Sequence, residues 1–310
     1  MPATLIGLAC LIVFALSQAA RDAFFANVFQ SVSFLVVAIL AFGGSTTVFG
    51  AWAWLDKPKE LRVLVAHRRL FLGLNATTAA AWLAYFFALK NLEPAIVNTL
   101  YTGIGPIAVL ALSALGLPLA RGGRTGRLER IGYFGVGASL LAVAAVATTG
   151  QSGLVGKPSG SAASAVLVAT IGGALITFSH MIARRLADLG ISSKALLGLR
   201  FLFTLGLALA AELALGRAEM RPDLDAVPFL ALAAFALIVI PSFFLQLGIA
   251  RTSPLAVNVI RSLGPIFVFA VQQLDGRIRF SAGTLACILA FIGFALLTSV
   301  LRGWAEAGRK

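Results

Sequence analysis

The sequence has few of the residues on which most enzymes and small secreted proteins depend. Only 12% of its 310 residues are charged, and it contains two histidines and two cysteines. Cys10 and Cys287 lie in apolar segments, where a thiol behaves as a small apolar side chain and implies no disulfide framework. No Walker loop, DxDxDG loop, HExxH pair or nucleophile elbow occurs. We therefore expect no metal, cofactor, ATP or enzymatic activity.

The composition is otherwise strongly apolar, with 59% hydrophobic residues and a mean hydropathy of +0.95. A helix needs roughly 20 apolar residues to cross a bilayer, and ten such windows occur. Continuously apolar runs such as Leu140–Ala147 favour helices over the alternating strands of a membrane barrel. We expect an all-α integral membrane protein in a lipid bilayer. The expected spans are 3–20, 33–55, 70–89, 94–118, 130–149, 162–183, 195–215, 226–250, 254–274 and 281–301.

The net charge of +13 would suggest nucleic-acid binding in a soluble protein. Here the basic residues concentrate in alternate loops, which is the positive-inside pattern of membrane proteins. Both termini are then expected in the cytoplasm, and no nucleic-acid partner is expected. An excess of Arg over Lys, with abundant alanine, indicates a GC-rich bacterial genome and hence the inner (plasma) membrane.

One segment of the sequence occurs twice. Leu92–Asn98 aligns with Thr252–Asn258, with Pro and Asn in register, and Gly105–Ile107 aligns with Gly264–Ile266. The copies begin the fourth and ninth expected helices, so they face opposite ways, as in the inverted repeats of secondary transporters. We expect two five-helix repeats, at 1–150 and 162–310, joined by a connecting loop at 151–161.

Each repeat carries a proline deep within its fourth helix, Pro106 or Pro265. A proline there removes one backbone hydrogen bond and loosens the helix. The freed carbonyl groups of Thr102 and Arg261 need other partners or a water-filled cavity. We expect the two prolines to act as helix hinges; a static kink used for packing is the alternative.

These features together resemble the drug/metabolite transporter superfamily, EamA type, over the whole chain. The ordered set that carries the resemblance occurs in both halves: Pro106 and Pro265, the segments Tyr85–Leu89 and Phe243–Ala250, and the glycines Gly135, Gly137, Gly283 and Gly293. The resemblance is closest to the branch of aromatic amino-acid exporters, which implies outward passage of amino acids. One departure concerns the acidic residue that follows the fourth helix in many such repeats. Asp275 fills this position in the second repeat, whereas 116–121 in the first repeat has no acidic residue.

The twelve acidic residues are all expected in loops, in tails or near helix ends. Asp22 is expected in the first loop, and Glu212 within a turn of the outer end of the seventh helix. Without a carboxylate near the membrane centre, a carboxylate proton relay is not expected. Facilitated passage, or coupling through His180, is favoured instead.

Polar groups within spans are costly and suggest a functional site. Arg261 has a fixed charge that could bind the carboxylate of a solute. The alternative is that its side chain extends to the cytoplasmic surface or caps a freed carbonyl group. Arg200 lies nearer a helix start, so we expect it to reach the cytoplasmic surface. Asn98 and Asn258 occupy equivalent turns of the two halves, where interhelical hydrogen bonds rival contact with a solute.

The third helix has a polar and aromatic face that suits a flat solute, because Asn75, Thr78, Trp82 and Tyr85 share one side of it. An interfacial position is the alternative for Tyr85 and His180. The predicted cavity residues are Asn75, Thr78, Trp82, Tyr85, Asn98, Tyr101, His180, Gln246, Asn258 and Arg261.

The predicted function is secondary transport by alternating access, with aromatic or neutral amino acids exported as the small organic solute. Export of drugs or other metabolites is the first alternative. Among these metabolites, nucleotide sugars or phosphate esters would require several inward-facing Lys or Arg, of which only Arg261 is well placed. A lipid-modifying enzyme would need clustered His, Asp or Glu, and a passive pore or structural protein would show no saturable transport.

Overall fold

The computed structural model describes residues 3–115, 126–155, 159–215, 222–252 and 254–307. Apart from one isolated bridge between Leu154 and Ile278, the regular structure of these residues is helical. Nine of their helical segments are long and apolar enough to cross a membrane, by length and composition. An all-α protein with multiple apolar helices is therefore confirmed. The total of ten spans, the two repeats and the cytoplasmic position of the termini stay predictions.

In the part of the chain expected to be the first repeat, the described residues form six helices. Five are long, and one short helix lies between the second and the third long ones. Their bounds are α1 Ala3–Val28, α2 Phe34–Asp56, α3 Pro58–Ala66, α4 Arg68–Asn91, α5 Pro94–Ala114 and α6 Arg127–Thr148.

The remaining part has more interruptions. Its helices are α7 Ser159–Asp188, α8 Ser193–Leu199, α9 Leu202–Leu215, the 3-10 turn η3 Leu224–Ala226, α10 Val227–Ala234, the π-helical turn η4 Phe235–Val239, α11 Ile240–Arg251, α12 Pro254–Ser262, α13 Gly264–Gln272 and α14 Ala282–Ala307. The expected span 195–215 corresponds to α8 with α9, 226–250 to α10 through α11, and 254–274 to α12 with α13. The shorter apolar segment Ala256–Gln272 falls below the length of the other nine.

The first span was predicted to end at residue 20, which is wrong, because α1 continues to Val28. Asp22 was placed in a loop for the same reason, and it instead lies within α1, 0% exposed. Arg21 and Asp22 form an ion pair of 2.6 Å. Since each charge offsets the other, the pair does not end the helix.

The charged segment after α2 was expected to be a loop, but it forms α3. Pro58 stands in the first turn, where its missing amide costs nothing, and Glu60 is also in that turn. Leu64 is buried, whereas Lys59 and Arg62 are exposed. This short helix is therefore amphipathic, which explains why a search for long apolar windows misses it.

The two proline-containing helices differ. Pro106 lies inside α5, which continues unbroken to Ala114. At the equivalent place in the second half, α12 ends at Ser262 and α13 begins at Gly264, next to Pro265. The helix is thus interrupted near Pro265, whereas it is continuous through Pro106, although the local sequences match. Whether either proline acts as a hinge stays a prediction.

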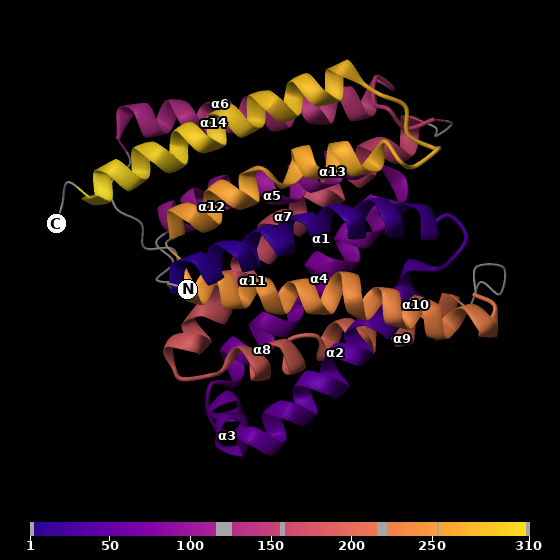
Figure 1. The fold of residues 1–310 in the computed structure, drawn as a ribbon, viewed down its shortest axis with the longest axis vertical. Helices are drawn as coiled ribbons and strands as arrows, with labels where there is room; N and C mark the ends of the chain where they lie inside the picture. Colours follow the sequence, from indigo (N-terminus) through magenta and orange to yellow (C-terminus); the bar gives the residue numbers. More distant parts are fainter. Residues whose placement is uncertain (1–2, 116–125, 156–158, 216–221, 253, 308–310) are drawn as a thin grey trace.

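The helices lie roughly side by side across the bundle (Figure 1). α6 packs with α14 along one edge, α4 and α5 both pack against α7, and α1 packs against α11. Close approach depends on small residues, because a Cβ at Gly135 of α6 would overlap the ring of Phe294 on α14. The beginning of α1 and the end of α14 lie at the same end of the bundle (Figure 1).

Candidate functional site

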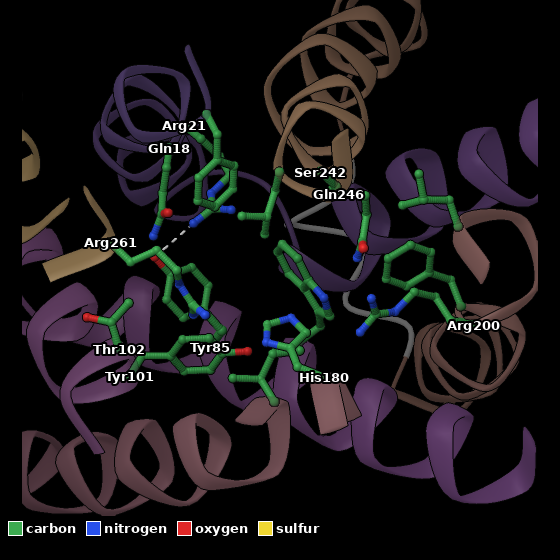
Figure 2. A pocket seen from close by; sticks show the side chains of 16 residues that line it. Gln18, Arg21, Tyr85, Tyr101, Thr102, His180, Arg200, Ser242, Gln246 and Arg261 are labelled. Atoms are coloured by element: carbon green, nitrogen blue, oxygen red, sulfur yellow. Dashed lines mark hydrogen bonds between the residues drawn. The ribbon is translucent and has the colours of Figure 1, made fainter. Parts of the chain in front are cut away.

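A pocket lies inside the bundle among α1, α4, α5, α7, α8, α11 and α12 (Figure 2). The space between its walls is about 650 Å³, and this figure includes space continuous with the outside. Its walls come from both expected halves of the chain. The lining residues with polar or charged groups are Gln18, Arg21, Trp82, Tyr85, Tyr101, Thr102, His180, Arg200, Ser242, Gln246 and Arg261.

Six of the predicted cavity residues line this pocket, and they come from five different helices. Thr102 lines it as well, so both residues whose carbonyl groups were expected to be freed by the prolines lie there. Contact with a solute stays a prediction for all of them. The six are Trp82, Tyr85, Tyr101, His180, Gln246 and Arg261.

The other four predicted residues are not among those that line it. Asn75 is buried, and its Oδ1 accepts a 3.3 Å hydrogen bond from the backbone N–H of Phe203. Thr78 and Asn98 are buried in hydrogen-bond networks beside the pocket, and Asn258 is exposed. The alternative considered for Asn98 and Asn258 was a hydrogen bond between helices. Asn98 makes such a bond, because its Nδ2 donates to Asp22 on α1.

Asp22 lies at the centre of a buried network behind the pocket wall. It accepts hydrogen bonds from Arg21 Nε at 2.8 Å, Tyr85 Oη at 2.6 Å and Asn98 Nδ2 at 2.9 Å. Arg21 also donates to Tyr85 Oη at 3.0 Å, and its Cζ lies 5.3 Å from the centre of the Trp82 ring. The network joins α1, α4 and α5. Tyr85 is 1% exposed, so its ring is covered by the protein.

Arg200 was expected to reach the cytoplasmic surface, and this is wrong, because the residue is only 4% exposed. It lies between the end of α8 at Leu199 and the start of α9 at Leu202. Its Nη2 donates to Ser179 Oγ at 2.9 Å and to Thr78 Oγ1 at 3.4 Å, while its buried Nε has no hydrogen-bond partner among the described residues. The break between the two helices turns this side chain inward.

Arg261 and His180 are partly exposed and line the pocket. Within the described part of the chain, no hydrogen bond or ion pair to the Arg261 side chain occurs. Figure 2 shows Arg261 and Arg200 on opposite sides of the pocket, with His180 between them. The three arginines make the wall cationic, and Asp22 offsets only one of them.

Sequence reasoning missed five polar lining residues: Gln18, Arg21, Thr102, Arg200 and Ser242. Arg21 and Asp22 are adjacent residues of opposite charge beside an apolar run, and this signal was available. Arg200 had a weaker signal, because the helix break that turns it inward contains neither Gly nor Pro at its two residues, 200 and 201.

A second polar cluster lies at the end of the bundle where α4 meets α5. Glu93 accepts hydrogen bonds from the backbone N–H of Gly153 at 2.8 Å, from Thr284 Oγ1 at 3.0 Å and from Gln272 Nε2. Burial raises the pKa of Glu93, and these three donors lower it by less. The cluster ties the turn before α5 to α13 and α14, across the two expected halves.

Neither a family model nor a curated protein matches the sequence. A solved crystal structure of another protein is similar in fold, with a TM-score of 0.62 over 96% of this chain and 96% of that one. The two sequences are 18% identical, so the similarity concerns the fold alone. The chain is thus a multi-helix membrane protein whose fold is also found in a solved structure.

Proposed function

We propose that the protein is a secondary transporter that carries a small organic solute across its membrane by alternating access. One observation carries this proposal: a pocket with polar and charged walls lies inside an apolar helical bundle, between helices of both expected halves. Buried charges are costly in such a bundle and mark solute pathways in membrane proteins. Transport through the pocket, without ATP or a cofactor, is the simplest use of this arrangement.

Two classes of solute fit parts of the wall. Trp82, Tyr85 and Tyr101 offer ring faces for a flat side chain, which supports the amino-acid hypothesis. Arg21 and Arg200 join Arg261 in the pocket, which supplies the several inward-facing arginines that an anionic metabolite requires. Export and the inner bacterial membrane remain part of the proposal.

Counterflow in proteoliposomes tests the proposal. Liposomes that contain the purified protein are loaded with unlabelled solute, and uptake of the labelled solute is followed. We expect saturable uptake that exceeds that of protein-free liposomes and is diminished in Arg261→Gln, whereas Arg62→Gln, which removes an exposed charge on α3, leaves it unchanged. No counterflow of amino acids or organic anions by folded protein would contradict transport.

A further inference from the structure

The pocket wall is unbalanced in charge. Its lining includes Arg21, Arg200 and Arg261, and none of the described residues that line it is Asp or Glu. The nearby carboxylate of Asp22 is 0% exposed and accepts from three side chains of the protein. A bound solute therefore meets cationic groups and finds no free carboxylate.

Arg21, which also lines the pocket, is paired with Asp22. Within the described residues, no carboxylate lies within ion-pair distance of Arg200 or Arg261. An unpaired charge away from water is costly unless a partner supplies the opposite charge. Among the described residues, these two guanidinium groups have no such partner.

Arg200 is moreover held in place while part of its hydrogen-bonding capacity stays unused. Ser179 and Thr78 fix one end of its guanidinium, and the buried Nε has no partner. Guanidinium groups bind carboxylate and phosphate oxygens by two parallel hydrogen bonds. Arg261 lies across the pocket from Arg200 (Figure 2), so the two guanidinium groups offer two separate contacts for negative charge.

From this arrangement we propose that the solute is an organic dianion, with acidic groups bound by Arg200 and Arg261 and a flat part against Trp82. The inference rests on the proposed transport function and specifies the class of its solute. A zwitterionic amino acid meets this wall less well, because its ammonium group would lie in a cationic pocket without a counter-charge. The dianion supplies the charge that the two arginines lack.

Four small molecules with one aromatic ring test the charge preference: phenylsuccinate as dianion, hydrocinnamate as monoanion, phenylalanine as zwitterion and phenethylamine as cation. Binding is followed in detergent through the fluorescence of Trp82, and Trp82→Phe identifies the signal. Each arginine–carboxylate contact is expected to change affinity about tenfold or more, which corresponds to ~1.4 kcal/mol. We expect phenylsuccinate to bind most tightly and phenethylamine most weakly.

Variants test whether Arg200 and Arg261 cause the preference for the dianion. Arg261→Gln should weaken phenylsuccinate binding about tenfold, to the level of hydrocinnamate, and Arg200→Gln should act similarly. Arg62→Gln should leave the binding unchanged. If Arg200→Gln does not fold, Arg261→Gln still decides the question, because its side chain has no hydrogen bond to any described residue. Equal or tighter binding of phenylalanine, or unchanged phenylsuccinate binding by Arg261→Gln, overturns the inference.

Counterflow separates the two proposals. Charge-dependent binding of phenylsuccinate without counterflow of any solute would overturn transport and support the dianion site. Counterflow of phenylalanine or phenethylamine in preference to both anions would support transport and overturn the dianion site.

Discussion

At the scale of single residues, the ion pair of Arg21 and Asp22 shows why a buried charge need not end a helix. Both residues are nearly inaccessible, and the carboxylate also accepts from Tyr85 and Asn98. Removing one member of such a pair leaves the other unpaired away from water, and this costs more than the intact pair contributes. The pair should therefore behave as a unit.

A double-mutant cycle tests this coupling. Asp22→Asn and Arg21→Gln should each destabilise the protein by about 3–5 kcal/mol, and the double variant should lose clearly less than the sum. The measurement is unfolding by denaturant in detergent. Additive losses would mean that the two charges do not stabilise one another. Lys194→Gln with Asp56→Asn, an exposed pair, is the control and should couple by no more than about 1 kcal/mol.

The raised pKa of Glu93 predicts that the stability of the folded protein depends on pH. Because burial raises its pKa in the folded state, the folded protein holds this proton more tightly than the unfolded chain. Stability is then greatest below the ordinary pKa of a glutamate and decreases as the pH rises through the raised folded value. Melting temperatures should fall more steeply for the wild type than for Glu93→Gln as the pH rises from roughly 4, near that ordinary value, to about 8. Parallel curves would contradict the assignment.

At the scale of elements, long apolar windows predicted the helices well, and departures occurred where local chemistry competes with hydropathy. The span predicted for α1 ended too early, because Arg21 and Asp22 were treated as two separate charges. α3 was missed because only one of its faces is apolar. The inward turn of Arg200 depends on the break between α8 and α9, and this break has no local sequence signal. Tertiary contacts with Ser179 and Thr78 hold the arginine, and one sequence does not reveal such contacts.

The two matched prolines make a prediction for their helices. Pro265 stands beside a break and Pro106 within a continuous helix, so Pro265→Ala should restore the amide needed to bond the carbonyl group of Arg261. We expect counterflow to fall severalfold in Pro265→Ala, because the segment loses freedom, while Pro106→Ala changes it less. Solute binding, measured by Trp82 fluorescence, should persist in both variants. Equal effects on counterflow would contradict the difference between the two helices.

At the scale of the whole molecule, polar contacts join the expected halves at both ends of the bundle. Glu93 contacts Gly153, Gln272 and Thr284 at one end. Glu60 lies on α3, before the start of α4, whereas Glu93 follows the end of α4. Glu60 accepts hydrogen bonds from the backbone N–H and the hydroxyl group of Ser192, at 2.8 and 2.6 Å. α4 has 24 residues, or a length of about 36 Å at 1.5 Å per residue. Alternating access requires the contacts of one end to open while those of the other persist.

Access to the pocket can be followed with a thiol at Thr102, which lines it on α5. In a protein without Cys10 and Cys287, Thr102→Cys is labelled by a membrane-impermeant reagent from one side at a time. Glu93→Ala removes contacts at the end expected outside and should increase labelling from that side. Glu60→Ala should increase labelling from the opposite side, because each change favours the state in which its own end is open. Increased labelling from the same side in both variants would contradict two opposed gates and leave the pocket with a single entrance.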